Sequence, residues 1–260
     1  MELLPAAVGL HEHVPRSLTP GANQHWFEPL ADHLGAAYLR YSFTKGTEQE
    51  VEFLYGALGL EPGARLLDVG CGPGRHAGAF VARGIDVVGV DIAQRFIDVA
   101  RERVPGATFE RMDARRLPYD AEFDAAVSLC QGAFGLVGPG DDLDVLRGIA
   151  RALKPGGHCA VSAFSSYFQV KYPQERGTFD AATGVHHEQT VLKSEAGTEL
   201  DADLWTTCYT ARELGLLFDR AGLTVDHIWS VEPGKYGRDE PTVETPELLV
   251  VAFRAAQIVR

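Results

Sequence analysis

The stretch LLDVGCGPGRHAGAF, residues 66–80, joins an apolar run to a glycine-rich loop and then to a helical pattern. Gly70, Gly72 and Gly74 stand two residues apart, and Asp68 precedes them. Glycine lets a backbone approach a ligand closely and tolerates positive φ. Open α/β sheets bind their ligands at such a point, where a strand ends and the next helix begins. The stretch therefore predicts a parallel sheet with a ligand site at this strand end.

The spacing of the glycines separates this loop from two common phosphate-binding loops. Dinucleotide enzymes use GxGxxG and place a pyrophosphate on the helix N-terminus, whereas this loop reads GxGxG. Asp68 suits a ligand that carries an ammonium better than one that carries a pyrophosphate, although the alternative is that it caps the amides of the loop itself. The loop lacks GK[ST], which excludes a P-loop.

Two further carboxylates are expected at the ends of the next two strands. Asp91 follows Asp68 by 23 residues, and Asp113 follows Asp91 by 22. A carboxylate at the end of the second strand can accept hydrogen bonds from both hydroxyls of a ribose. One at the end of the third strand can accept from an exocyclic amine such as adenine N6. Together the three carboxylates describe an adenosine with an amino-acid tail.

Strand and helix patterns alternate beyond the glycine loop. This alternation is typical of βαβ units around a parallel sheet. After an insertion, one more helix and two strands follow. We expect strands at 64–70, 86–91, 107–113, 123–130, 158–164, 223–231 and 246–254, and helices at 75–84, 93–104, 141–153 and 211–222.

Two helices are predicted before the first strand. Residues 1 to about 24 contain three prolines and read as an extended lead-in. Aromatic and aliphatic residues then recur at spacings of three and four from Gln24 to Tyr41. Thr47, followed by Glu50, has the spacing of a capping box, which predicts a helix from Glu48 to near residue 59.

Residues 165–204 interrupt the alternation with a polar insertion that is too long to be a bare connection. It is expected to form two strands, 185–192 and 200–210, joined by a turn. We therefore expect one domain in four parts: an N-terminal helical cap (1–60), a cofactor-binding core (61–163), an inserted hairpin lid (164–210) and the C-terminal part of the sheet (211–260).

Composition narrows the class of protein. The formal net charge of −12 disfavours binding to nucleic acid. The four cysteines are far apart and form no CxxC, so no disulfide framework is expected. The N-terminus lacks the pattern of a signal peptide, and no apolar run reaches the ~20 residues that span a bilayer. We expect a cytoplasmic protein that does not bind membranes.

Five motifs, LLDVGCGPG, VVGVD, MDARRLP, FDAAVSL and LKPGGH, resemble in their order the class I S-adenosylmethionine-dependent methyltransferases. They cover about residues 63–163, and the chain looks most like the bacterial small-molecule enzymes of that family. The resemblance implies a Rossmann-like three-layer α/β sandwich with a seven-stranded, mostly parallel sheet and an antiparallel last strand. It also implies S-adenosyl-L-methionine as cofactor, S-adenosyl-L-homocysteine as product, and in-line methyl transfer to an N, O or C atom of a small molecule.

The resemblance also assigns positions to the cofactor. The glycines would lie beside its methionine part, Asp91 would hold the ribose, and residues 112–114 would bracket the adenine. Cys130 and Gln131 would follow the fourth strand and face the reacting methyl group. The implied cofactor contacts are Asp68, Gly70, Cys71, Gly72, Gly74, Asp91, Ile92, Met112, Asp113, Ala114, Cys130 and Gln131.

Residues for the acceptor pocket come from the elements expected to cover the cofactor. Each has a plainer structural alternative: the N-terminal aromatics pack a helix, His76 packs or caps one, Cys71 and Cys130 fill space, and the segment 186–188 is a solvated strand. No metal site is expected, because adjacent strand residues point to opposite faces. The candidates for substrate binding are Tyr38, Tyr41, Phe43, Phe134, His187, Trp205 and Tyr209, and those for a catalytic role are Tyr41, His76, Gln131 and His186.

Two other functions stay open. One is a methyltransferase that acts on a protein or an RNA, although the PPY or PPF triplet of adenine and glutamine N-methyltransferases is absent after VSL, where the chain reads CQGAFG. The other is a protein that binds S-adenosylmethionine without transferring its methyl group. A small-molecule acceptor is the expected partner, and a homodimer stays open.

Overall fold

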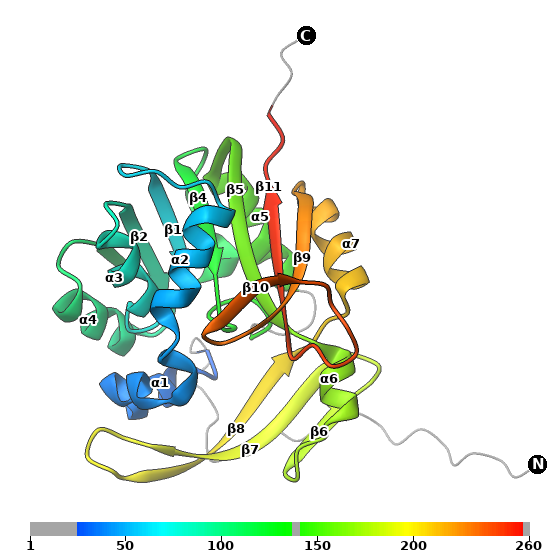
Figure 1. Cartoon of the computed structure of the whole chain (residues 1–260). Coiled ribbons are helices and arrows are strands. Elements are labelled where there is room, and N and C mark those ends of the chain that lie inside the picture. Colours follow the sequence, from blue (N-terminus) through cyan, green and yellow to red (C-terminus); the bar gives the residue numbers. More distant parts are fainter. Residues whose placement is uncertain (1–24, 137–140, 257–260) are drawn as a thin grey trace, which may run out of the picture.

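The computed structural model describes residues 25–136 and 141–256, so the expected lead-in lies outside the described residues. Its centre is an eight-stranded sheet with the strand order β10-β9-β11-β5-β4-β1-β2-β3 (Figure 1). The strands of this sheet are β1 (Arg65–Val69), β2 (Asp86–Asp91), β3 (Thr108–Arg111), β4 (Phe123–Ser128), β5 (Leu153–Phe164), β9 (Thr224–Glu232), β10 (Lys235–Asp239) and β11 (Glu247–Phe253).

Strands β1 to β5 run parallel, as the alternation of strands and helices predicts. Strand β11 inserts between β5 and β9 and is antiparallel to both, so the expected antiparallel last strand is confirmed. The seven expected strands are present, and β10 adds an eighth at the edge by pairing with β9. The carboxyl ends of β1, β2 and β4 therefore meet at one edge of the sheet.

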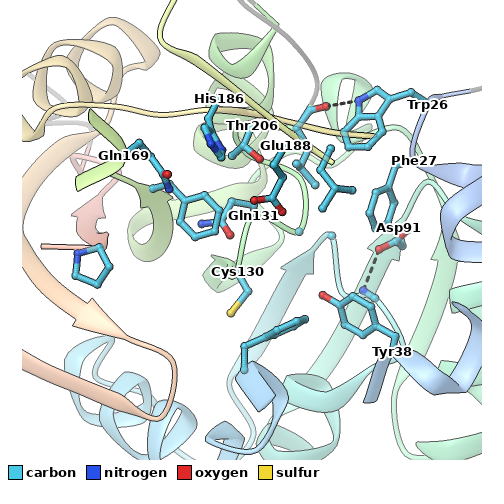
Figure 2. Close-up of a pocket in the computed structure, with 18 of the residues that line it drawn as sticks. Trp26, Phe27, Tyr38, Asp91, Cys130, Gln131, Gln169, His186, Glu188 and Thr206 are labelled. Atoms are coloured by element: carbon cyan, nitrogen blue, oxygen red, sulfur yellow. Dashed lines mark hydrogen bonds between the residues drawn. The ribbon is translucent and has the colours of Figure 1, made fainter. Parts of the chain in front are cut away.

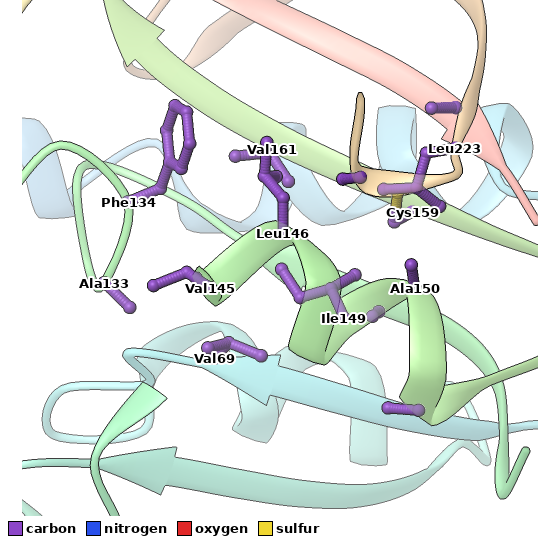
Figure 3. Close-up of a cluster of buried hydrophobic side chains, with 14 of the residues drawn as sticks. Val69, Ala133, Phe134, Val145, Leu146, Ile149, Ala150, Cys159, Val161 and Leu223 are labelled. Carbon is purple, nitrogen blue, oxygen red and sulfur yellow. The ribbon is translucent and has the colours of Figure 1, made fainter. Parts of the chain in front are cut away.

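Helices cover both faces of this sheet. On one face, α5 and α7 pack on alternate residues of the strands, and their buried side chains include Leu146, Ile149 and Phe218 (Figure 3). On the other face, α2, α3 and α4 contribute Leu54, Phe80 and other apolar residues to a second cluster. The helices are α1 (Glu28–Leu34), α2 (Thr47–Ala57), α3 (Arg75–Val81), α4 (Gln94–Arg103), α5 (Asp142–Ala152), α6 (Ser166–Lys171) and α7 (Ala211–Ala221), with 3-10 turns at η2 (Gly35–Arg40), η3 (Ser42–Thr44) and η4 (Ala114–Arg116).

The capping box expected at the start of α2 is wrong. The helix begins at Thr47 with Gly46 as its N-cap, and no side chain caps it. The hydroxyl of Thr47 donates to the carbonyl of Thr44 at 2.8 Å. The carboxylate of Glu50 points into the protein instead, where it accepts hydrogen bonds from Arg75 and other groups. A buried arginine binds this carboxylate more strongly than the exposed amide of a cap would.

The insertion forms a separate three-stranded antiparallel sheet, here called the lid sheet: β6 (Gly177–Asp180), β7 (Val185–Lys193) and β8 (Glu199–Thr207). The expected hairpin is β7–β8, and β6 adds a third strand. Figure 1 shows the lid sheet below the carboxyl ends of the main strands, next to α1. At the β7–β8 tip, the Glu195 carboxylate accepts from the Ala36 amide and from Arg95, each at 2.9 Å.

Among the residues that the model describes, none of the helices has the length and apolar character needed to cross a membrane.

Candidate functional site

A cavity of about 420 Å³ lies where the carboxyl ends of the main strands face the lid sheet and the N-terminal aromatic segment (Figure 2). Its lining is mostly apolar, with a few polar groups, which is typical of small-molecule sites. It is lined by Trp26, Phe27, Tyr38, Phe43, Gly70, Gly72, Asp91, Phe96, Cys130, Gln131, Gly132, Leu136, Phe164, Phe168, Gln169, Gln174, His186, Glu188, Leu204, Thr206 and Pro246.

The glycine loop forms the floor of the cavity. Gly70 and Gly72 have φ values of 76° and 52°, a backbone region that favours glycine. A Cβ atom on Gly70 would stand 2.1 Å from the carbonyl carbon of Gly132, so the loop after β1 lies directly against the loop after β4. Gly74 does not line the cavity; it contacts Ala100 instead and marks the start of α3.

Asp91 closes the end of β2 and holds the glycine loop in place. Its carboxylate accepts from the amide of Gly72 at 2.9 Å and from that of Ala93 at 2.8 Å. Burial raises its pKa to about 6, despite these two hydrogen bonds. The side chain borders the cavity, so a carboxylate stands where the sequence predicts a partner for ribose hydroxyls.

Asp68 lies behind the loop rather than in the cavity wall. It is 1% exposed, and its Oδ2 atom has no hydrogen-bond partner among the described residues. Burial raises the pKa of this carboxyl to about 7. Cys71 is likewise buried and does not line the cavity. The amide of Gly72 donates to Asp91, so the structure gives the capping of this loop to Asp91.

A second, narrower pocket of about 30 Å³ adjoins the cavity and shares Gly70 and Asp91 with it. The residues that the resemblance assigns to adenine and its surroundings, Ile92, Met112, Asp113 and Ala114, all line this pocket. Arg115 donates to the carboxylate of Asp113 through its backbone and side chain and lowers the pKa of this group.

Cys130 and Gln131 follow β4 and border the cavity in a strained turn. Their φ values are 51° and 53°, and such values are uncommon outside glycine. The backbone amide of Cys130 donates to the hydroxyl of Ser162 at 2.8 Å, and the Gln131 amide group donates to Glu247 at 3.3 Å. These two contacts hold the turn in place, and burial raises the pKa of the Cys130 thiol.

A buried group of charges supports this turn from the helix side. The Arg75 guanidinium contacts the Cys130 sulfur at 2.9 Å and donates to Glu50 at 2.6 Å. His76 donates to the same carboxylate at 2.7 Å, and its burial next to Arg75 lowers its pKa to about 4, so the ring is neutral. His76 therefore lies one layer behind the cavity and does not line it.

On the lid sheet, the alternation of side chains along each strand decides which residues face the cavity. His186 and Glu188 lie two apart on β7 and both line it, together with their partners Thr206 and Leu204 on β8 (Figure 2). His187 lies on the opposite face, where it stacks on Trp205 and bonds to Asp203 at 2.7 Å.

Of the remaining candidates, Tyr38 and Phe43 line the cavity, and Tyr41 packs against both from outside it. Phe134 and Tyr209 stack on each other in the buried cluster around α5 and do not reach the cavity. The structure adds Phe164 at the end of β5, and Phe168 and Gln169 from the short helix α6. Helix α6 is a short helix within the polar insertion, and no periodic pattern in its sequence predicts it.

Within the described ranges, no three His, Cys, Asp or Glu side chains are grouped in a way that would hold a metal ion.

Comparisons with known proteins find methyltransferases. A family model described as a methyltransferase domain matches residues 66–157. The malonyl-[acyl-carrier protein] O-methyltransferase of Salmonella typhimurium is 33% identical over 134 residues, which are 51% of either chain. The chain thus spans about half the length of the first curated relatives that it matches. The cypemycin N-terminal methyltransferase of a Streptomyces species is 30% identical over 210 residues, 74% of this chain and 84% of the relative.

Solved structures share the fold over most of their length. The CcbJ methyltransferase from Streptomyces caelestis superposes with a TM-score of 0.73 at 18% identity, covering 87% of this chain and 97% of the other. CalS10, an amino pentose methyltransferase from Micromonospora echinaspora, has a TM-score of 0.61 at 23% identity and covers 85% and 95%.

Proposed function

This chain belongs to the class I S-adenosylmethionine-dependent methyltransferase family, and on that basis we propose that it transfers the methyl group of S-adenosylmethionine to an N, O or C atom of a small molecule. The observation that best supports the proposal is the continuity of the site. The ends of β1, β2, β3 and β4 line two adjoining pockets, and the larger pocket extends under the lid sheet.

The residues present fit the cofactor. Gly70 and Gly72 leave bare backbone beside the space for the methionine part, and Asp91 offers carboxylate oxygens at the place for the ribose. The pocket at Met112 and Ala114 would take the adenine.

When bound, the cofactor would supply a methyl group on a positively charged sulfur, an electrophile that needs no further activation. The protein would then act mainly by positioning the acceptor in line with that methyl and by excluding water, and such orientation is worth several kcal/mol. Cys130 and Gln131 border the cavity in a turn held by Ser162 and Glu247, so this turn would present fixed groups to the reacting atoms.

The first experiment is a calorimetric titration of the protein, freed of bound product, with S-adenosylmethionine. We expect micromolar binding. The variant Asp91→Ala should bind at least about tenfold more weakly, the value of one hydrogen bond to a charged group. Asp86→Ala is a matched control, because Asp86 lies at the other end of the same strand, exposed and 3.6 Å from Arg65.

Thermal melting of both variants shows whether they are folded, since Asp91→Ala also leaves the amides of Gly72 and Ala93 without a partner. A folded wild-type protein that gives no binding heat contradicts the proposed function. Equal affinities of the two variants contradict the role of Asp91.

A further inference from the structure

The charged side chains in the cavity wall are all acidic among the residues that the structure describes. Of the described residues that line it, Asp91 and Glu188 are acids, and none is a lysine or an arginine. Arg75, which contacts the lining residue Cys130, is already paired with the buried Glu50. Because Asp91 is assigned to the ribose of the cofactor, Glu188 is the charge that an acceptor would face, and it would repel a carboxylate or phosphate there.

His186 is a buried polar group turned toward this cavity. It is 5% exposed, and its ring makes no hydrogen bond with any residue that the structure describes. Gly177 on β6 leaves room for the ring, since a Cβ atom there would stand 2.7 Å from its Nε2 atom. Burial lowers the pKa of His186, so the imidazole is neutral and offers a lone pair. Buried polar groups usually have a partner, which suggests that a ligand supplies it here.

Glu188 stands on the same face of β7, two residues further on. It forms no ion pair with another part of the described chain, unlike Asp203 on the opposite face, which accepts from His187. Aromatic side chains complete the wall, among them Trp26, Tyr38 and Phe168. Aromatic faces favour cations, and an unpaired carboxylate favours them more.

Resting on the proposed function, we infer that the acceptor is a primary or secondary amine on an apolar body, and that His186 and Glu188 bind its nitrogen. The amine binds as its ammonium form and releases one proton to solvent water, and the neutral nitrogen then gives its lone pair to the methyl carbon. The bond from that carbon to sulfur breaks with its electron pair staying on sulfur, which becomes a neutral thioether.

The nitrogen keeps its remaining protons and gains the positive charge, so a carboxylate at Glu188 stabilises charge that develops there during transfer. An alcohol is far less acidic than an ammonium ion, so an alcohol acceptor would have to give its proton to a protein base during the transfer itself. A neutral imidazole whose pKa lies below its usual value is poorly matched to that task.

The test uses the full-length protein loaded with S-adenosyl-L-homocysteine, and it follows the cofactor titration, so a failure to bind cofactor is seen first. The probes are trios of amine, alcohol and carboxylate on phenyl, naphthyl and cyclohexyl ethyl skeletons. Binding is measured by calorimetry. Turnover is measured separately, with S-adenosylmethionine, as the amount of S-adenosyl-L-homocysteine formed.

We expect at least one amine to bind about tenfold more tightly than its alcohol and carboxylate, and to be methylated. Glu188→Gln should remove that preference. His186→Asn should lower the affinity for the amine and leave the affinities for the alcohol and carboxylate unchanged. Asp203→Asn, an acid-to-amide change on the other face of the lid sheet, should leave the preference for the amine unchanged. Cofactor affinity and melting temperature of each variant show that the fold is kept. A preference for alcohols or carboxylates, an equal effect of Asp203→Asn, or no binding of any probe to cofactor-competent protein overturns the inference.

Discussion

Gly70 and Gly132 touch through their backbones and join the loop after β1 to the loop after β4. A Cβ atom on Gly132 would stand 2.2 Å from the carbonyl oxygen of Gly70, closer than two such atoms can approach. One loop carries the floor of the cavity, and the other carries Cys130 and Gln131. The spacing of the two loops, and with it the shape of the cavity, depends on the absence of a side chain at both positions.

Gly132→Ala should therefore lower the affinity for S-adenosylmethionine by about tenfold or more, since the loops must move apart. Calorimetric titration measures this. The matched control is Gly56→Ala on α2, where a Cβ atom would meet nothing within 4 Å. Alanine there should leave affinity unchanged and raise stability by about 1 kcal/mol through helix propensity. Wild-type affinity in Gly132→Ala would contradict the argument.

Glu50→Gln should strongly destabilise the protein. The fully buried carboxylate accepts from Arg75, from His76 and from the amide of Gly234, and the amide side chain would leave Arg75 without a counter-charge. Breaking a buried ion pair in this way costs about 3–5 kcal/mol. Urea unfolding measures the loss.

The control for Glu50 lies on the same helix. Glu52 pairs with Arg83 at the surface, and its side chain is 75% exposed. Glu52→Gln should change the free energy of unfolding by less than about 0.5 kcal/mol. If the two variants lose similar free energies of unfolding, the buried ion pair contributes no more to stability than the surface pair.

Asp68→Asn should stabilise the cofactor-free protein at alkaline pH. Burial raises the pKa of Asp68 in the folded state from 3.8 to about 7, so the folded state binds its proton more tightly than the unfolded state. The carboxyl therefore lowers stability progressively as pH rises from about 4 to 7. Removing it should leave stability near pH 4 unchanged and raise it at pH 8 by up to about 4 kcal/mol.

Asp124→Asn should give the opposite sign. Despite partial burial, hydrogen bonds from the Arg65 amide and Lys154 lower the pKa of Asp124, so its contribution is present above its unfolded pKa and is lost on acidification. Unfolding curves of both variants from pH 2.5 to 8 measure the two differences from wild type, and the loss of the Asp124 contribution is expected below about pH 4. Parallel profiles for the variants would contradict the assignment.

Tyr209→Phe should lower stability without changing cofactor affinity. Its hydroxyl donates to the buried carboxylate of Asp142, which also accepts from the amide of Gly135. Losing one partner of a buried carboxylate costs about 1–3 kcal/mol. In Tyr236→Phe, by contrast, the hydroxyl removed is buried without a partner among the described residues, and stability should hold or rise. Unfolding and titration of both variants separate these outcomes.

Local signals were enough to predict most of the central sheet. Buried apolar runs and turn residues mark β1, β2, β4 and β5, the alternation with helices marks β3, and the glycine loop marks the edge at which ligands are expected to bind. Strands β6 and β10 were not predicted because they are short and contain few buried residues, and β10 is placed by contacts that are distant in sequence. Gly234, in the turn before it, lies against Gly46 and donates to Glu50.

The acceptor side of the site was harder to predict, because it depends on the register between strands. Two adjacent histidines, His186 and His187, were both candidates, and only one can face a cavity from a strand. The choice follows from how the lid sheet is docked, which no local pattern encodes. Trp205 pairs with His187 and so lies on the same outer face. The prediction of a capping box at Glu50 failed for a similar reason. Its spacing from Thr47 fits a cap, but its side chain binds Arg75 and His76 of α3.

The lid sheet is held to the rest of the protein at both of its ends. One end continues into the body through the backbone pairing of Ser165 with Tyr209, and the far tip rests on Arg95 and Ala36 through Glu195. Near the tip, Leu192 of β7 and Ala202 of β8 are also buried in one apolar cluster with residues of α1. Salt would weaken the ion pair of Glu195 with Arg95 but not this apolar contact, so we expect the lid sheet to stay docked on α1 at high ionic strength.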